Sequence, residues 1–273
     1  MAIASPLKWH GGKSYLAKRI VELMPKHLTY CEPFAGGLSV LLEKDPEGVS
    51  EVVNDLNESL TNFWTVLQDQ RLFERFQRCV EATPFSESEY FMSSLNTGGT
   101  HLIDDAVYFF IRCRQSLAGR MDSFAPLSRS RVRRGMNEQV SAWLTAVEGL
   151  PAVHARLKRV AVTNRPAVKV IKDLDHPETL FYCDPPYLKE TRTAKEVYHH
   201  EMTTEDHADL LVALSEIKGK FILSGYPSDL YEAHRRDHGW QRIDIEIDNK
   251  AAGGGSKRKM TECLWMNFTP NVG

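Results

Sequence analysis

Apolar positions along the chain follow two spacings, one typical of helices and one of buried strands. In residues 14–25 the apolar side chains recur every three or four positions, which predicts a helix. Short apolar runs predict strands at residues 29–31, 52–55, 160–162, 180–183, 221–223, 243–247 and 263–268. Strands that alternate with helices indicate an α/β fold, here a doubly wound, Rossmann-like sheet.

The middle of the chain has a different pattern. From about residue 68 to 157 no convincing strand occurs, and helical spacing predicts helices at 72–80, 86–95, 102–117 and 137–147. We therefore expect a catalytic α/β domain made of residues 1–67 and 158–273, with a mainly helical insertion at residues 68–157. A chain of 273 residues with 42% hydrophobic content is long enough to bury cores for both parts.

Asp184-Pro185-Pro186-Tyr187 directly follows the predicted strand at 180–183 and is the sharpest chemical signal in the chain. Two successive prolines fix two φ angles, remove two backbone donors and restrict Asp184 to an extended conformation. The carboxylate and the Pro185 carbonyl can accept both hydrogens of a planar amine, while the tyrosine ring offers a stacking face. Sites in α/β sheets lie beyond the carboxyl ends of strands, which favours this interpretation over a plain strand-ending turn.

A second motif, Glu32-Pro33-Phe34-Ala35-Gly36-Gly37, lies between the predicted strand at 29–31 and a predicted helix from residue 38. Such a glycine turn lets the backbone approach a ligand closely. No Lys-Ser/Thr pair follows the glycines, so an uncharged nucleoside fits better than a phosphate in a P-loop. Asp55, about eighteen residues further on, ends the next strand, where doubly wound folds place a carboxylate on ribose hydroxyls.

Four stretches, in this order, resemble the Dam-type DNA adenine-N6 methyltransferases, the group alpha amino-methyltransferases. They are residues 8–13 (Lys-Trp-His-Gly-Gly-Lys), residues 32–37, Asn54-Asp55 and residues 184–187. The resemblance implies S-adenosylmethionine as cofactor and methyl transfer to the N6 amino group of an adenine flipped out of DNA. The chain departs from the family at Phe-Ala-Gly-Gly, where other members carry Gly-x-Gly, and Ala35 is small enough to permit close approach.

Two sets of site residues follow from the motifs and from this resemblance. The expected catalytic residues are Asp184, Pro185, Pro186 and Tyr187. The expected cofactor-binding residues are Trp9, Lys13, Glu32, Pro33, Phe34, Ala35, Gly36, Gly37, Asp55 and Asp184. Without the resemblance, Trp9 and Lys13 would read as an anchor for the N-terminal arm and the start of a helix.

DNA is the expected partner, although the formal net charge is −2, so attraction to phosphate must come from local clusters. One such cluster is rich in arginine and holds a single acid, Asp122, so we expect the helical insertion to recognise DNA. Its members are Arg112, Arg114, Arg120, Arg129, Arg131, Arg133 and Arg134. Residues 115–135 are predicted to form a loop against the DNA backbone; the competing interpretation is a solvated loop that only aids solubility.

Metal and membrane are not expected as partners. The cysteines form no Cys-x-x-Cys pair and have no matching histidine spacing, and no apolar run approaches transmembrane length. We expect the protein to be located in the cytoplasm of a bacterial or phage-infected host cell. Two other functions stay open: a methyltransferase for another planar amine (cytosine N4, RNA adenine or protein glutamine), and a non-catalytic DNA-binding protein on the same scaffold.

Overall fold

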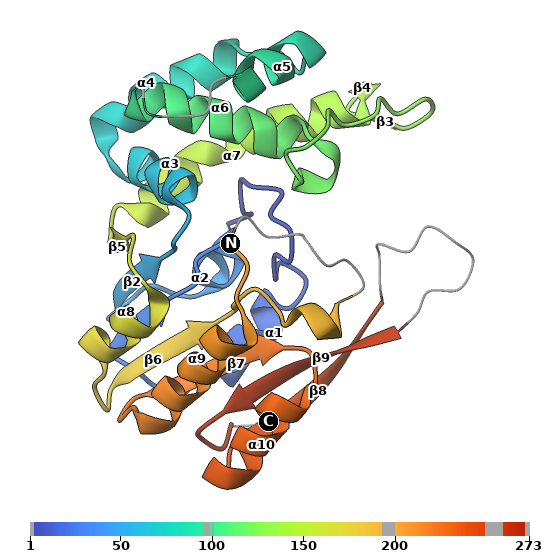
Figure 1. The fold of residues 1–273 in the computed structure, drawn as a ribbon. Coiled ribbons are helices and arrows are strands. Elements are labelled where there is room, and N and C mark those ends of the chain that lie inside the picture. The colour runs from blue at the N-terminus through green and yellow to red at the C-terminus, as the bar shows by residue number, and fades with distance from the viewer. Residues whose placement is uncertain (1–2, 96–98, 100, 193–199, 249–258, 271–273) are drawn as a thin grey trace. The chain divides into compact units, whose positions relative to one another are not determined.

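The computed structural model describes residues 3–95, 99, 101–192, 200–248 and 259–270, and the chain folds into two compact units (Figure 1). Unit 1 consists of Met1–Glu22, Gly36–Pro46 and Asn57–Asn164. Unit 2 consists of Leu23–Ala35, Glu47–Leu56 and Arg165–Gly273. Each unit is therefore assembled from segments that are far apart in the sequence.

A seven-stranded sheet has the order β5-β2-β1-β6-β7-β9-β8. Its strands are β1 (Thr29–Glu32), β2 (Ser50–Asn54), β5 (Val160–Thr163), β6 (Thr179–Cys183), β7 (Lys220–Gly225), β8 (Gln241–Asp248) and β9 (Lys259–Met266). β1 pairs in parallel with β2 and β6, and β6 pairs in parallel with β7, whereas β9 is antiparallel to both β7 and β8. The predicted α/β class with a Rossmann-like sheet is confirmed, and the strand order reverses between β1 and β6, where doubly wound folds bind ligands.

Helices α8 (Ala167–Leu174), α9 (Thr204–Glu216) and α10 (Asp229–His238) cover one face of the strands in unit 2 (Figure 1). Their apolar side chains share a buried cluster with strand residues such as Phe181 and Leu223. β6 is buried at each of its positions, which explains the continuous apolar sequence from Leu180 to Cys183. The strand that leads into Asp184 is therefore held rigidly on all sides.

Polar side chains fix where the helices of unit 2 begin and end. Thr203 and Asp206 form a capping box at the start of α9, and Ser228 caps α10 through the backbone N–H of Tyr231. α10 ends at Gly239, whose φ of 66° is the left-handed conformation that favours glycine. These caps satisfy backbone groups that the ends of α9 and α10 would otherwise leave unpaired.

Helices predominate in unit 1, and aromatic side chains hold them together. The helices are α1 (Ala17–Leu23), α2 (Ser39–Glu43), α3 (Glu58–Gln68), α4 (Gln70–Ala82), α5 (Glu87–Leu95), α6 (Leu102–Gln115) and α7 (Glu138–Leu157). Phe63 of α3 stacks on Phe110 of α6 with ring centroids 5.7 Å apart, and Phe110 lies 5.3 Å from Trp143 of α7. Aromatic pairs at these separations stabilise helix packing beyond the area they bury.

The predicted helices of the middle region are present, but the last of them is longer than predicted. α7 runs on to Leu157 with Pro151 inside it, ten residues beyond the expected end at 147. Leu150 and Val153, on either side of this proline, are fully buried. Tertiary packing therefore stabilises a helix that local propensity would end.

The expectation that residues 68–157 hold no strand was also wrong in detail. A small hairpin joins β3 (Val132–Arg133) to β4 (Met136–Asn137). Its turn residues Arg134 and Gly135 have φ of 53° and 73°, as a two-residue type I′ turn requires. The arginine-rich segment thus includes a defined hairpin as well as irregular backbone.

Candidate active site

Contacts within unit 2 hold the tyrosine of the turn that follows β6. The Tyr187 hydroxyl donates a hydrogen bond to Glu262 of β9, and it lies 3.3 Å from Oδ1 of Asp184. The Tyr187 ring meets Tyr226 edge to face, with centroids 4.8 Å apart and an interplanar angle of 76°. Tyr187 is therefore fixed both at its hydroxyl and at its ring.

Burial and charge decide what this tyrosine can do chemically. Tyr187 is 6% exposed and Glu262 1%, whereas Asp184 is half-buried. Burial, and then the charges of Asp184 and Glu262, raise the pKa of Tyr187 well above its ordinary value. Tyr187 is a neutral phenol that donates its hydrogen, so the acceptors for an amine at this turn are the Asp184 carboxylate and the backbone carbonyls.

A histidine that carries no sequence motif supports the same turn. His207, in the first turn of α9, is fully buried, and its Nδ1 lies 2.9 Å from the Tyr231 hydroxyl of α10. Burial lowers the pKa of His207 to about 4, and the nearby backbone of Pro186 only partly opposes that shift. A neutral imidazole thus links α9 and α10 to the proline turn.

Asn54 fastens the turn that begins at Glu32 to the end of β2. Its Nδ2 donates to the carbonyls of Pro33 and Arg165 at 3.0 and 2.8 Å, and its Oδ1 accepts from the Arg165 amide at 2.9 Å. The Ala35 amide donates to the Asn54 carbonyl at 2.8 Å. Asp55 comes next in the chain, so a half-buried carboxylate follows directly on a rigid junction.

The acid at the start of the second motif is buried within its own strand. Glu32 is 2% exposed and accepts a hydrogen bond of 2.8 Å from the Tyr30 hydroxyl. Burial, then the charge of Glu32 and this hydrogen bond, raise the pKa of Tyr30. Phe34 packs against the apolar cluster of unit 2. These side chains stabilise the turn from inside the sheet.

In unit 1, Trp9 explains why the end of the same motif is glycine. Gly36 has a φ of +45°, and a Cβ atom there would lie 2.8 Å from Nε1 of Trp9. A Cβ atom at Gly37 would lie 2.9 Å from Cβ of Trp9. The Gly36 carbonyl also accepts a hydrogen bond from Nε1 of Trp64 at 3.2 Å. Close approach of Trp9 therefore demands both glycines, independently of any ligand.

The N-terminal arm that carries Trp9 is packed against the helical part of unit 1. Nζ of Lys8 donates to Gln139 of α7 at 3.3 Å, and burial together with the charge of Arg114 lowers the pKa of Lys8 to about 8. A Cβ atom at Gly119 would lie 1.7 Å from the Lys8 carbonyl oxygen. Lys13 is buried and donates to the Gly11 carbonyl at 2.9 Å. The arm is thus packed into unit 1 as part of its structure.

The arginines of the predicted DNA surface differ in exposure. Arg131 and Arg133 flank Val132 of the hairpin with side chains 77% and 72% exposed, each 3.5 Å from Glu138. Arg114 of α6 instead donates to the Ala142 carbonyl at 2.7 Å, and burial lowers its pKa. Arg112, also on α6, is half-buried, whereas Arg120, Arg129 and Arg134 are exposed. The hairpin therefore presents two exposed cations that a polyanion can reach.

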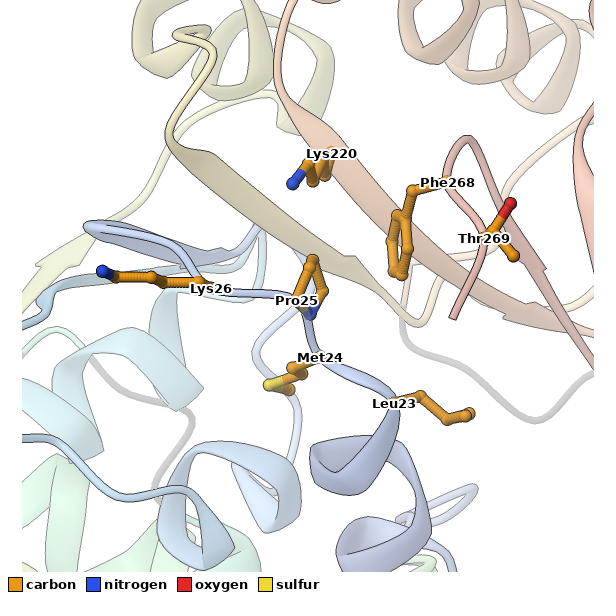
Figure 2. Close-up of a pocket in the computed structure, with 7 residues that line it drawn as sticks. All are labelled: Leu23, Met24, Pro25, Lys26, Lys220, Phe268 and Thr269. Carbon is orange, nitrogen blue, oxygen red and sulfur yellow. The ribbon is translucent and has the colours of Figure 1, made fainter. Parts of the chain in front are cut away.

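A cavity of about 250 Å³ lies elsewhere in unit 2 (Figure 2). Its lining includes Pro25 and Lys26, which precede β1, and Lys220, the first residue of β7. These are the amino ends of the parallel strands, whereas Asp184 follows the carboxyl end of β6. The cavity is therefore not part of the site at the Asp184 turn.

Neither a metal-binding cluster nor a membrane-spanning helix occurs among the described residues. No group of three or more histidine, cysteine or acidic side chains in the part of the chain that the structure describes could hold a metal ion. No helix among the same residues is long and apolar enough to cross a membrane.

Comparison with known proteins gives likenesses to solved structures and a family. The chain resembles PH1948 of Pyrococcus horikoshii, a candidate RNA methyltransferase, with a TM-score of 0.33 and 10% sequence identity over 93% of this chain and 77% of that one. A likeness this low carries no argument. The family model for D12 class N6 adenine-specific DNA methyltransferases matches residues 9–244, which include the arm, the glycine turn, Asp55 and the Asp184 turn. Because this match spans most of the chain, the protein belongs to the D12 class N6 adenine-specific DNA methyltransferases.

Proposed function

We propose that this enzyme binds the N6 amino group of a flipped-out adenine at the turn formed by Asp184, Pro185 and Tyr187. The observation that carries this assignment is the construction of the turn. A half-buried carboxylate follows a fully buried strand, beside a tyrosine fixed by Glu262 and Tyr226. The base has to leave the duplex because N6 within a stacked pair cannot be reached in line with the sulfonium methyl.

The turn can activate an amine without covalent catalysis. An amino group on an aromatic ring is a poor nucleophile because its lone pair is delocalised. When the Asp184 carboxylate and the Pro185 carbonyl accept both amine hydrogens, the nitrogen becomes more sp³-like and its lone pair is localised. These acceptors therefore stabilise the transition state more than the resting substrate.

The proton released in the reaction needs no strong base. A protonated aniline-like nitrogen is acidic enough to lose its extra proton to water. Tyr187 has a raised pKa and holds its own proton, so it is not the acceptor. Asp184 acts as a hydrogen-bond acceptor during transfer and not as the group that drives it by deprotonation.

S-adenosylmethionine, when bound, supplies an electrophilic methyl group on a sulfonium sulfur. Asp55 fits such a ligand, since its half-buried carboxylate follows β2 beside the junction fastened by Asn54 and can accept ribose hydroxyls. Trp9, Lys13, Gly36 and Gly37 of unit 1 are proposed contacts on the strength of the family. The proposed contacts from Glu32 to Ala35 build the turn and offer their backbone groups more than their side chains. Asp184 is the last of the proposed cofactor contacts.

DNA recognition is proposed for residues 68–157, with residues 1–67 and 158–273 as the catalytic part. Arg131 and Arg133 support the assignment because their guanidinium groups are exposed on a short, defined hairpin. Arginine in such a position can bind phosphate or read guanine edges. Arg114 is the weakest of the proposed contacts because its guanidinium already bonds a helix carbonyl.

Methyl transfer to defined nucleic acids tests the proposal. The purified chain would be incubated with methyl-labelled S-adenosylmethionine and duplex DNA that lacks modified bases, then digested and analysed by mass spectrometry. We expect label in N6-methyladenine, and none with the Asp184→Ala variant. Label in N4-methylcytosine, or label that appears with RNA but not with DNA, would contradict the proposed substrate.

A further inference from the structure

Glu262 is a buried acid next to the proposed amine site, and it lies outside the residues 9–244 that match the family. It belongs to β9, where the residues that follow it, Cys263 to Met266, are all buried. A carboxylate at 1% exposure is costly unless hydrogen bonds compensate for the missing water. Tyr187 supplies one such bond through its hydroxyl.

Tyr187 has one hydroxyl hydrogen and two carboxylates within reach. The oxygen-to-oxygen distance to Asp184 is 3.3 Å, beyond the usual range for a hydroxyl donor. The contact with Glu262 is the shorter one, so the hydrogen goes to Glu262. The carboxylate of Asp184 therefore keeps its acceptor strength, which a hydrogen bond from Tyr187 would reduce.

The ring contact makes this competition unavoidable. Tyr226 contacts the ring of Tyr187 edge to face. The two prolines between Asp184 and Tyr187 restrict the backbone that joins these two residues. If the Glu262 carboxylate were removed, the hydroxyl would still lie beside Oδ1 of Asp184 and would donate there. Asp184 would then be a weaker acceptor for an incoming amine.

We infer that Glu262 is a positioning residue, which draws the Tyr187 hydroxyl away from Asp184, so that this hydroxyl does not compete with the target amine for the Asp184 carboxylate. The inference rests on the proposed amine site. Glu262 acts through Tyr187 and touches no substrate.

Kinetics of Glu262 variants test the inference. Glu262→Ala should lower kcat for methyl transfer about tenfold, the effect of weakening one charge-assisted hydrogen bond in the transition state, with little change in KM for DNA or cofactor. Glu262→Gln keeps an oxygen that can accept the hydroxyl, so its kcat should stay within about threefold of wild type.

The Tyr187→Phe background separates positioning from simple structural support. Phenylalanine has no hydroxyl that could compete for Asp184, so within this background Glu262→Ala should change kcat less than about twofold. A structural role would predict the same reduction in both backgrounds, and that result would overturn the inference. Thermal melting curves, monitored by circular dichroism, are the control that each variant is folded.

Two further outcomes are kept distinct. If Glu262→Ala does not fold, Glu262→Leu takes its place, because leucine fills similar volume and carries no acceptor; the same comparison of backgrounds then decides. If the wild-type chain methylates no adenine in duplex DNA, the proposed function fails. If the wild type is active and the Glu262 effects match in both backgrounds, only the positioning role fails.

Discussion

Replacing Gly36 with alanine should destabilise the glycine turn through two separate effects. The backbone φ of +45° is left-handed, and a Cβ atom in that region costs about 1–2 kcal/mol. The same atom would lie 2.8 Å from Nε1 and 3.0 Å from Cδ1 of Trp9, so the indole must shift. Overpacking of this kind costs about 1–3 kcal/mol. We therefore expect the free energy of unfolding to fall by about 2–5 kcal/mol.

Gly48 provides the matched control. Its φ is +71°, and a Cβ atom there would meet nothing within 4 Å. Gly48→Ala should therefore show only the backbone cost of about 1–2 kcal/mol. The assay is urea denaturation of both variants, monitored by circular dichroism. The excess destabilisation in Gly36→Ala measures the conflict with Trp9.

A double variant completes the test. Trp9→Ala removes the obstructing ring, so adding Gly36→Ala to it should cost no more than Gly48→Ala costs alone. Equal destabilisation by Gly36→Ala and Gly48→Ala in the otherwise wild-type chain would refute the reasoning. The glycine at this turn would then not be required by Trp9.

Two further predictions concern pH and DNA. The pKa of His207 falls from 6.5 to about 4 on folding, so the unfolded chain binds an extra proton in that window. The free energy of unfolding should be highest above pH 6.5 and should fall by up to about 3 kcal/mol as the pH drops towards 4. Urea midpoints measured at several pH values check this prediction. An equal pH dependence in the His207→Phe variant would contradict it. Neutralising Arg131 and Arg133 with glutamine should weaken DNA binding and reduce the slope of log K against log salt by about 1 for each phosphate that is no longer neutralised. Arg236→Gln, at an exposed position on α10, is the control, and an unchanged slope in the hairpin variant would place the DNA surface elsewhere.

The sheet could be predicted from sequence because its strands are short, apolar and bounded by turns. β6 is the clearest case, since burial on both faces leaves Thr179, its first residue, followed by an uninterrupted run from Leu180 to Cys183. The four motifs predict the family, the adenine-N6 activity and the use of S-adenosylmethionine; the family match confirms the first two and implies the third. The hairpin at β3 and β4 was not predicted, because Arg134 in the left-handed region departs from the usual turn residues.

The partners of the motif residues could not be predicted, because they come from elements distant in sequence. Glu262 lies 75 residues from Tyr187 in the sequence. The only sequence signal for its burial is that a single acid directly precedes an apolar run. Asn54 was taken together with Asp55 as one motif, but its amide is used to fasten the turn to Arg165. Trp9 accounts for glycines that sequence reasoning assigned to ligand approach alone.

The acceptor role of Asp184 is tested most directly by single-turnover methyl transfer at saturating S-adenosylmethionine. Asp184→Asn keeps the side-chain volume and replaces one acceptor oxygen with a donor group. We expect the rate constant for transfer to fall about 100- to 1000-fold, as when one transition-state hydrogen bond is removed elsewhere, while the melting temperature stays close to that of the wild type. A wild-type rate in folded Asp184→Asn would contradict the assigned amine site.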